Sequence, residues 1–334
     1  MKKIAILGGG SWGTALAIVL TRSRQPHSIA LWVRGAGLAQ TMREERVNAV
    51  YLPGFELPPA VEITSDLSVA LEGAEIVLGV MPSGHAREVY SAALPFLDPR
   101  MMFVSATKGL DTGTLERMTQ VLAGICRPKF AARVAALSGP SFAREVARGD
   151  PTAIVVASED TALAECIQED LSGSTLRLYT NTDVGGVELG GAVKNVVAIA
   201  AGVCEGLGFG HNTAAALITR GLAEITRLSC ALGARRETLT GLAGMGDLVL
   251  TCTSGLSRNR SVGVALGRGE RLEDILASTR MVAEGVRTTA ATVELARHAG
   301  LEMPITEQMY AVLYQGRAPR DAIRELMERR LKQE

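Results

Sequence analysis

A glycine-rich turn near the amino terminus constrains the fold of this chain more than any other feature. Lys3–Leu7 is a short apolar run that leads at once into the glycines of the pattern G-x-G-x-x-G, Gly8, Gly10 and Gly13. The apolar segment Thr14–Thr21 follows as an expected helix. A strand, this turn and a helix, in that order, predict a dinucleotide-binding α/β unit in which the helix start receives a pyrophosphate. The alternative is a glycine-rich turn that binds nothing.

The residue after the second expected strand bears on which dinucleotide would bind. Ser28–Val33 is that strand, and Arg34 follows it directly. NAD-specific folds usually place an acid here to hold the ribose 2′-hydroxyl, but the first acid after this strand is Glu44. An arginine can pair with a 2′-phosphate instead. Arg34 therefore favours NADP(H), or tolerance of both NADP(H) and NAD(H). A solvent-exposed arginine without a binding role is the competing interpretation.

Further short apolar runs predict the rest of a doubly wound sheet. They are Val61–Thr64, Glu75–Val80, Met101–Ala106, Val134–Ser138, Thr152–Ala157 and Leu176–Thr180. Loops that follow the carboxyl ends of parallel strands face the ligand crevice in this architecture. Lys108, just past Ala106, is therefore a candidate functional residue. The turn Gly139–Ala143 also follows a strand, and a helix start there can present backbone N–H groups to an anion.

The pattern changes after Asp183, where strand-like runs stop and helical periodicity continues to the end of the chain. With only 4% aromatic residues and 47% hydrophobic residues, the chain suits layered, closely packed helices and sheets better than a β-sandwich. We therefore predict two domains. Residues 1–188 form the dinucleotide-binding α/β domain of the Rossmann type, and residues 189–334 form a helical substrate and catalytic domain.

A lysine in the first helical stretch of the second domain is a candidate acid–base group. Gly185–Gly210 is nearly apolar, yet it carries Lys194. Only six of the 35 basic residues are lysines, so the chain meets its ordinary need for positive charge with arginine. A lysine can release a proton near neutral pH and an arginine cannot, which makes Lys108 a second candidate. The alternative for Lys194 is a side chain that snorkels from a buried helix to solvent.

Small residues next to Lys194 suggest room for a ligand. Gly190 and Gly191 lie one turn before it, and Val197 and Ala198 lie one turn after it. We expect this space to accept a substrate beside the ammonium group.

Two later segments offer the polar groups that such a substrate needs. The glycine-punctuated run Gly241–Asp247 delivers a single carboxylate, Asp247, which can orient or charge-balance a lysine. A helix N-cap is the alternative for Asp247. The polar, loop-like segment Thr251–Asn259 carries Arg258 beside Asn259. A guanidinium can bind a phosphate through two parallel N–H donors. A solvated loop arginine is the alternative there.

These groups together fit hydride transfer to a carbonyl. A nicotinamide supplies the hydride in such chemistry, and a protein group supplies the proton. A lysine suits the second role, because it can donate a proton during reduction and accept one during oxidation.

Composition argues against several other classes of protein. The net charge is zero, without the basic patch of a nucleic-acid-binding protein. The five cysteines and four histidines show no metal-ligand spacing, so we expect no metal site. The run at residues 1–10 is too short for a signal peptide, and no charge-free run reaches membrane length. We expect a cytoplasmic protein without a membrane span.

Segments along nearly the whole chain carry a family resemblance. They are GGGSWGTALA (8–17), NAVYLPG (48–54), ATKGL (106–110), SGPSFAREVARGDPTA (138–153), GVELGGAVKNVVAIAAG (186–202), NTAAALITRGLAE (212–224), GLAGMGDLVLTCTSGLSRNR (241–260), VAEGVRT (282–288) and EMPITEQMYAVLY (302–314). The chain resembles bacterial NAD(P)-dependent glycerol-3-phosphate dehydrogenases. The resemblance implies a Rossmann-type domain followed by an all-helical domain of the 6-phosphogluconate dehydrogenase-like kind. It implies interconversion of dihydroxyacetone phosphate and sn-glycerol 3-phosphate, which feeds phospholipid synthesis. A homodimer is also expected.

The resemblance also implies roles for single residues. Lys194 matches the family's proton acceptor, with Lys108 and Asp247 as further catalytic candidates. The matched cofactor contacts are Ser11, Trp12, Arg34, Lys108, Ala143, Arg258, Val282 and Glu284, beside the fingerprint glycines. The matched substrate positions are Lys108, Gly139, Ser141, Lys194, Asp247, Ser257, Arg258 and Asn259. The family often has another aromatic at Trp12 and threonine at Ser141, and neither change removes a needed group.

Two other functions compete with this one. A hydroxyacid dehydrogenase of the same two-domain superfamily also uses a lysine of the helical domain, but Ser257–Asn259 favour a phosphate over a carboxylate head group. A non-catalytic dinucleotide sensor would bind the cofactor without turnover and would tolerate loss of Lys194.

Overall fold

A computed structural model describes residues 1–278 and 283–330 of the chain. The chain forms two compact units. The first unit comprises Met1–Asp111 and Glu116–Glu188, and the second comprises Thr112–Leu115 and the chain from Leu189 onward. The short segment Thr112–Leu115 belongs to the second unit although it follows a strand of the first.

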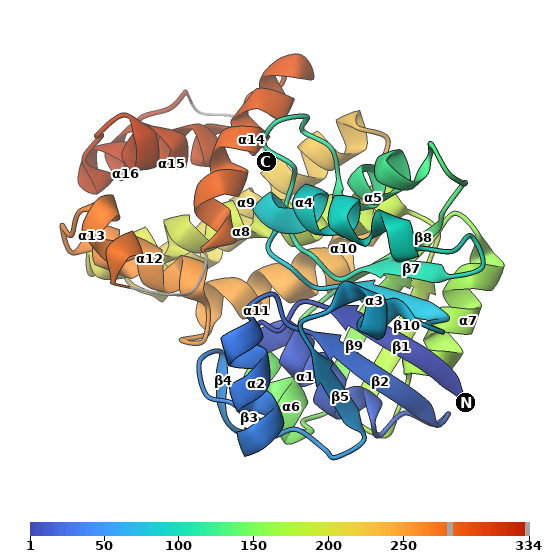
Figure 1. Ribbon diagram of the computed structural model, residues 1–334. Helices are drawn as coiled ribbons and strands as arrows, with labels where there is room; N and C mark the ends of the chain where they lie inside the picture. Colours follow the sequence, from blue (N-terminus) through green and yellow to red (C-terminus); the bar gives the residue numbers. More distant parts are fainter. Residues whose placement is uncertain (279–282, 331–334) are drawn as a thin grey trace. The chain divides into compact units, whose positions relative to one another are not determined.

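The first unit is built on an eight-stranded sheet with the order β10-β9-β8-β7-β6-β1-β2-β5 (Figure 1). The strands are β1 (Lys2–Leu7), β2 (His27–Trp32), β5 (Val61–Thr64), β6 (Ile76–Gly79), β7 (Met102–Ser105), β8 (Arg133–Ser138), β9 (Thr152–Ala157) and β10 (Leu176–Asn181). All neighbouring strands are parallel except β8 and β9, which pair antiparallel. The predicted doubly wound sheet is confirmed, and the reversal at β9 is a feature that the apolar runs do not reveal.

The strand order reverses at β1, which lies between β2 and β6. Leu7 at the end of β1 pairs with Trp32 of β2 and with Gly79 of β6, so the three strands end at one level. Ligands bind at such a switch point, beyond the carboxyl ends of the strands. The glycine-rich turn starts there.

Helices and a small hairpin complete the first unit. The helices are α1 (Ser11–Leu20), α2 (Ala36–Glu45), α3 (Leu67–Leu71), α4 (Ser83–Ala93), η1 (Leu94–Phe96), α5 (Met118–Cys126), α6 (Ala143–Arg148) and α7 (Thr161–Leu171). The hairpin consists of β3 (Val47–Asn48) and β4 (Leu52–Glu56).

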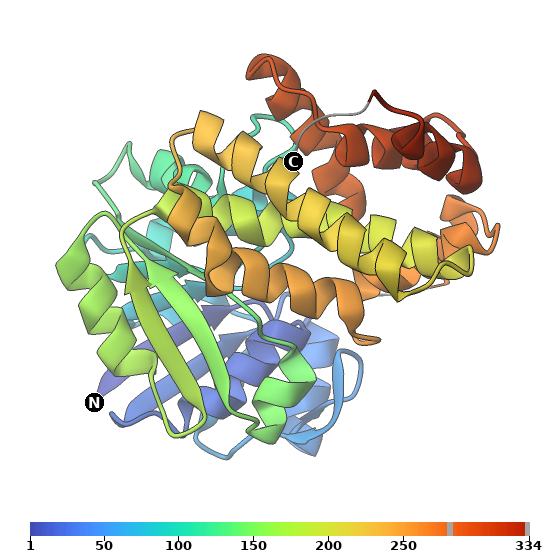
Figure 2. The ribbon, with the colours of Figure 1, turned by 180° about the vertical axis from the view of Figure 1, so that it is seen from behind.

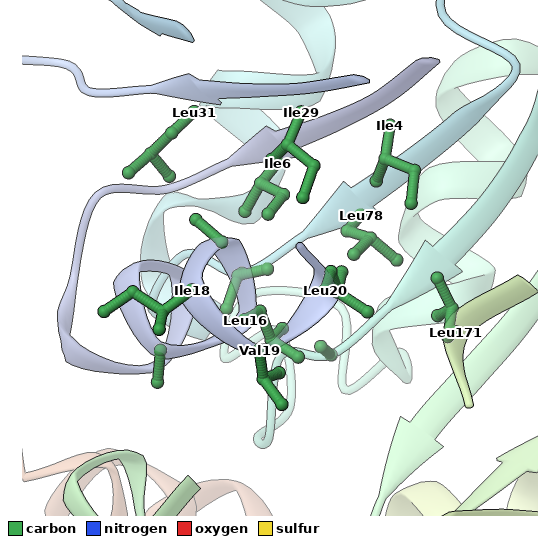
Figure 3. Packing of buried hydrophobic residues seen from close by; sticks show 14 of the residues in the cluster. Ile4, Ile6, Leu16, Ile18, Val19, Leu20, Ile29, Leu31, Leu78 and Leu171 are labelled. Carbon is green, nitrogen blue, oxygen red and sulfur yellow. The ribbon is translucent and has the colours of Figure 1, made fainter. Parts of the chain in front are cut away.

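Alternate residues of β1 are buried in two different clusters, because successive side chains of a strand point to opposite faces of its sheet. Ile4 and Ile6 belong to one cluster with the apolar side chains of α1, and Figure 3 shows this packing. Ala5 and Leu7 belong to the other cluster, which includes Tyr90 of α4 and Phe103 of β7. The sheet is thus covered on both faces, as a parallel sheet requires.

From Leu189 onward, the described residues of the second unit form helices joined by turns and loops. Its elements are α8 (Val184–Gly206, which begins in the first unit), α9 (His211–Ala231), α10 (Arg236–Thr240), η2 (Leu242–Gly246), α11 (Asp247–Thr253), α12 (Arg258–Gly267), α13 (Leu272–Ala277), α14 (Glu284–His298), α15 (Pro304–Tyr314) and α16 (Pro319–Met327). Figure 2 shows α8 and α9 from behind. Gly221 of α9 packs directly on Val197 of α8.

Helix α8 is the spine of this unit. It ends at Gly206, four residues before the end of the predicted stretch, and Gly208 then adopts a left-handed φ of 82°. Among the described residues, α8 is the one helix long and apolar enough to cross a membrane. Its apolar window is 100% buried in the protein, as in the core helix of a globular domain.

Candidate active site

Different steric constraints explain why individual positions of the fingerprint turn are glycine. Gly8 has a φ of 136°, and a Cβ atom there would lie 2.5 Å from the Val80 carbonyl oxygen. A Cβ atom at Gly13 would collide with the Gly8 carbonyl. These two glycines are therefore required by the fold itself.

Gly10 differs, because a Cβ atom there would meet no protein atom within 4 Å. Packing does not require glycine at this position, whereas the close approach of a ligand would. Gly10 is the N-cap of α1, and no acidic residue occupies the first helical turn. The first N–H groups of a helix lack intrahelical partners and favour an anion. The turn, with Ser11 and Trp12 at the helix start, thus fits the pyrophosphate of a dinucleotide.

Arg34 lies two residues beyond the end of β2 and is exposed. Its Nη1 atom lies 3.3 Å from Nδ1 of His85, at the start of α4. Contact between Arg34 and a nucleotide phosphate stays a prediction.

Three predicted substrate residues meet at one carbonyl group in the first unit. Lys108, beyond the end of β7, donates a hydrogen bond from Nζ to the Gly139 carbonyl at 2.8 Å. The Ser141 hydroxyl donates to the same carbonyl at 2.9 Å. Gly139 has a φ of 139° and packs against the backbone of Ile154, which a larger residue would displace. Ala143 begins α6 immediately afterwards and packs on the core.

Lys194 is a buried ionisable residue of the second unit, with a side chain only 6% exposed. Its ammonium group forms an ion pair with Asp247 and donates to the Thr251 hydroxyl at 2.8 Å. The same hydroxyl donates to the Asp247 carbonyl at 2.6 Å, which directs its lone pairs to the lysine. The side chain does not snorkel to solvent. Its charge is instead compensated inside the protein, as a buried charge requires.

A tight π-helical turn delivers Asp247 to the lysine. Leu242–Gly246 form the turn, and Asp247 begins α11 directly after it. A Cβ atom at Gly190 would lie 2.8 Å from the Ala243 carbonyl oxygen. The expectation that Gly190 and Val197 leave room for a ligand is therefore wrong. The absence of a side chain at Gly190 lets the π-helical turn pack against α8. The Val197 side chain packs against Gly221 of α9.

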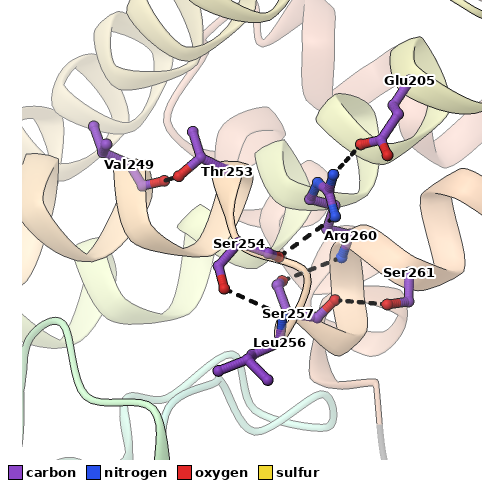
Figure 4. A network of polar contacts seen from close by, with 8 residues as sticks. All are labelled: Glu205, Val249, Thr253, Ser254, Leu256, Ser257, Arg260 and Ser261. Atoms are coloured by element: carbon purple, nitrogen blue, oxygen red, sulfur yellow. Dashed lines mark hydrogen bonds and ion pairs between the residues drawn. The ribbon is translucent and has the colours of Figure 1, made fainter. Parts of the chain in front are cut away.

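The expected phosphate-binding residues lie at a helix start, not in a long loop. Residues 251–253 end α11 and Arg258 begins α12, so only 254–257 connect them. The loop prediction failed because Ser257 acts as the N-cap of α12, its Oγ accepting from the Arg260 N–H at 3.2 Å. Figure 4 shows this connection, where Arg260 also reaches Ser254 and Glu205.

Asn259 is buried, and its side-chain oxygen accepts from the Gly285 N–H at 2.9 Å. This contact ties α12 to the start of α14, where Glu284 is the first residue. Val282, another predicted cofactor contact, lies outside the described residues. Arg258 is exposed on the first turn of α12.

Helices α8 and α12 cross with their backbones in contact. Gly202 and Gly206 on α8 face Gly263 and Gly267 on α12, and each position would place a Cβ atom against the other backbone. This crossing fixes the helix of Lys194 relative to the helix that carries Ser257–Asn259.

Known proteins are similar to this chain along nearly all of its length. Residues 3–164 match the model of the NAD-dependent glycerol-3-phosphate dehydrogenase N-terminus, and residues 183–324 match that of its C-terminus. A glycerol-3-phosphate dehydrogenase, NAD(P)+, from Koribacter versatilis is 57% identical over 330 residues, with 98% of each chain covered. The chain belongs to the NAD-dependent glycerol-3-phosphate dehydrogenase family.

Other members of the glycerol-3-phosphate dehydrogenase family agree with this assignment. A relative from Geobacter sp. (strain M21) is 52% identical over 333 residues, covering 100% of this chain and 99% of its own. The crystal structure of glycerol-3-phosphate dehydrogenase from Coxiella burnetii has a TM-score of 0.92 at 42% identity. It covers 98% of this chain and 99% of its own.

One polar residue beside the lysine escapes the sequence predictions. Thr251 lies one helical turn after Asp247, and that spacing places both on one face of α11. Treating the polar stretch as a loop hid this signal. Burial raises the pKa of the neighbouring Cys252 thiol to about 12, which disfavours the thiolate. The described residues include no cluster suited to a metal ion.

Proposed function

We propose that this chain reduces dihydroxyacetone phosphate to sn-glycerol 3-phosphate, and catalyses the reverse oxidation, with NAD(P)(H). The observation that carries the proposal is the buried Lys194–Asp247–Thr251 cluster in a member of this dehydrogenase family. The product would supply phospholipid synthesis in the cytoplasm, and we propose a homodimer.

The first unit holds the cofactor in this proposal. The start of α1, with Gly8, Gly10, Ser11, Trp12 and Gly13, binds the pyrophosphate. When bound, the nicotinamide supplies or removes the hydride. Arg34 binds a 2′-phosphate and so favours NADP(H) over NAD(H). Ala143 of the first unit is a further proposed cofactor contact, and the second unit would add Arg258, Val282 and Glu284.

The second unit supplies the proton. Lys194 donates a proton from Nζ to the carbonyl oxygen during reduction, and it takes the hydroxyl proton during oxidation. Asp247 and Thr251 hold Nζ in place. A positioned general acid of this kind contributes about 10²–10⁴-fold to the rate.

Cationic and hydrogen-bonding groups recognise the phosphate of the substrate. Ser257, Arg258 and Asn259 form the proposed phosphate site at the start of α12. Lys108, Gly139 and Ser141 are the proposed substrate contacts of the first unit. A guanidinium beside backbone N–H groups suits a phosphate dianion.

A substrate panel tests this function. Purified protein is mixed with NADP+ or NAD+ and with glycerol 3-phosphate, a 3-hydroxy acid or glycerol, and cofactor reduction is followed by absorbance. We expect turnover with glycerol 3-phosphate. Reduction with the 3-hydroxy acid alone would indicate a carboxylate substrate, and cofactor binding without any turnover would indicate a sensor.

A further inference from the structure

A buried asparagine outside the predicted site reaches into the glycine-rich turn. Asn48 belongs to the small hairpin that follows α2, and it is fully buried. Helix α2 ends at Glu45, and its C-cap residue Arg46 adopts a left-handed conformation with a φ of 53°. The hairpin register then shifts between Val47 and Asn48. Irregularities of this kind re-aim a side chain, and here the amide enters the protein beside α1.

The Asn48 side chain bonds to both flanks of the turn. Its Nδ2 donates to the Gly9 carbonyl at 2.9 Å and to the Thr14 hydroxyl at 2.8 Å. Gly9 lies on the strand side of the turn, and Thr14 lies in the first turn of α1. The amide oxygen accepts from the Tyr51 N–H at 3.1 Å, which holds the side chain in its orientation. Both N–H donors of the amide are therefore used on the turn.

The bond to Gly9 has a geometric consequence for the next residue. The peptide bond between Gly9 and Gly10 is planar and trans, so its carbonyl and its N–H point in opposite directions. When Asn48 fixes the carbonyl, it directs the Gly10 N–H away from the hairpin. Gly10 is also the glycine whose side-chain position meets no protein atom within 4 Å.

We propose that Asn48 is a positioning residue for cofactor binding, which sets the Gly9–Gly10 peptide and the first turn of α1 for the cofactor phosphates. The inference rests on the proposed function of the glycine-rich turn. Without the amide, the Gly9 carbonyl and the Thr14 hydroxyl lose a buried partner, and the peptide is free to rotate. Asn48 itself does not touch the reacting atoms, so its loss should lower cofactor affinity more than it slows the chemical step.

The test compares Asn48→Ala and Asn48→Asp with the full-length wild type. NADPH affinity is measured by nucleotide fluorescence, and KM and kcat are measured for each substrate. We expect the Kd and KM for the cofactor to rise about tenfold or more in Asn48→Ala, since a buried partner is left unsatisfied. The KM for dihydroxyacetone phosphate and the kcat at saturating cofactor should change less than about threefold.

The aspartate variant separates positioning from general loss of stability. An ionised carboxylate cannot donate to Gly9, whereas a protonated one can. NADPH affinity of Asn48→Asp should therefore recover towards wild type as the pH falls, and that of Asn48→Ala should not. If Asn48→Ala fails to fold, Thr14→Val removes one of the two bonds, and Thr14→Ser should restore cofactor affinity.

Ser158→Ala is the matched control. Ser158 is also buried in the first unit, where its hydroxyl donates to the Val134 carbonyl at 2.9 Å. This variant should lose stability without a change in cofactor KM. Unchanged cofactor affinity in a folded Asn48→Ala, or an equal rise in both KM values, would overturn the inference. A wild type that binds no NAD(P)H would instead overturn the proposed function.

Discussion

Two oxygen atoms contact the ammonium group of Lys194 inside an apolar helix. The ammonium lies between the Asp247 carboxylate and the Thr251 hydroxyl, and its side chain is almost wholly removed from water. Buried ion pairs of this kind add little net stability, since desolvation offsets their attraction. The pair therefore has a better explanation in catalysis than in folding.

Removal of one partner of this pair should be more harmful than removal of both. Asp247→Ala leaves an uncompensated buried charge and should lower the free energy of unfolding by roughly 3–5 kcal/mol. The double variant Lys194→Met with Asp247→Leu should regain most of that stability while remaining inactive. Urea denaturation of the two variants measures the difference. A double variant as unstable as Asp247→Ala would show that the charge is not the cause.

Arg34 should decide the preference between the two cofactors. Arg34→Asp places a negative charge where a 2′-phosphate is expected, so the KM for NADPH should rise more than the KM for NADH. Arg24→Asp, at an exposed position before β2, is the control and should change neither value selectively. Equal effects of Arg34→Asp on both cofactors would show that Arg34 does not contact the 2′-phosphate.

Among the helices, the crossing of α8 and α12 links the lysine to the proposed phosphate site. A methyl group at Gly263 would collide with the Ile199 carbonyl of α8, so α12 must shift. Gly263→Ala should destabilise the protein by about 1–3 kcal/mol and raise the KM for dihydroxyacetone phosphate. Thermal unfolding and steady-state kinetics measure the two effects.

Gly124→Ala in α5 is the control for this substitution, because a Cβ atom there meets no protein atom within 4 Å. It should be neutral or stabilising, since alanine favours a helix more than glycine does. A Gly263→Ala variant that behaves like Gly124→Ala would show that the crossing tolerates a wider separation.

Helix α15 begins at a buried carboxylate with an unusual pKa. Glu224 of α9 accepts from the Ile305 N–H at 2.7 Å and from the Thr306 N–H at 3.3 Å. Burial raises the pKa of this carboxyl to about 7, against the opposing effect of these hydrogen bonds. The folded state therefore holds a proton that the unfolded state releases at lower pH.

Wild-type stability should consequently fall as the pH rises from about 4.5 to about 7, relative to Glu224→Gln. The expected difference is roughly 3 kcal/mol at most. Urea unfolding of both proteins at several pH values measures it. Parallel stability profiles would show that the carboxyl titrates normally in the folded protein.

The strands and the long helices follow from local sequence, but several site details do not. Apolar runs identify the strands of the sheet, and the change of pattern after Asp183 identifies the helical half. The runs carry no information on direction, so the antiparallel β9 is not predictable from them. In the sequence, Gly190 suggests space for a ligand beside Lys194. The structure fills this space with the π-helical turn of residues 242–246.

Local sequence likewise predicts only part of the candidate site. The unusual lysine usage singles out Lys194, and the glycine-punctuated run singles out Asp247. Asn48 contacts Gly9, 39 residues away in the sequence, and no local pattern encodes that contact. The spacing of Asp247 and Thr251 becomes a signal only when residues 251–253 are recognised as helical. Family resemblance supplied Val282 and Glu284, which composition and spacing alone do not indicate.

The whole molecule divides the proposed chemistry between its two units. The first unit carries the fingerprint turn, and the second carries the proposed proton donor and the proposed phosphate site. Cofactor binding and proton transfer should therefore be separable by mutation. A variant of the lysine should leave the nucleotide-binding unit intact.

Lys194→Met tests this division most directly, because methionine keeps an unbranched apolar stem like that of lysine but has no ammonium group. NADPH binding is measured by fluorescence, and reduction of dihydroxyacetone phosphate is measured at saturating cofactor. We predict NADPH affinity within about threefold of wild type, with turnover lower by about 10²–10⁴-fold. Near-normal turnover in a folded Lys194→Met protein would contradict the assignment of the proton to Lys194.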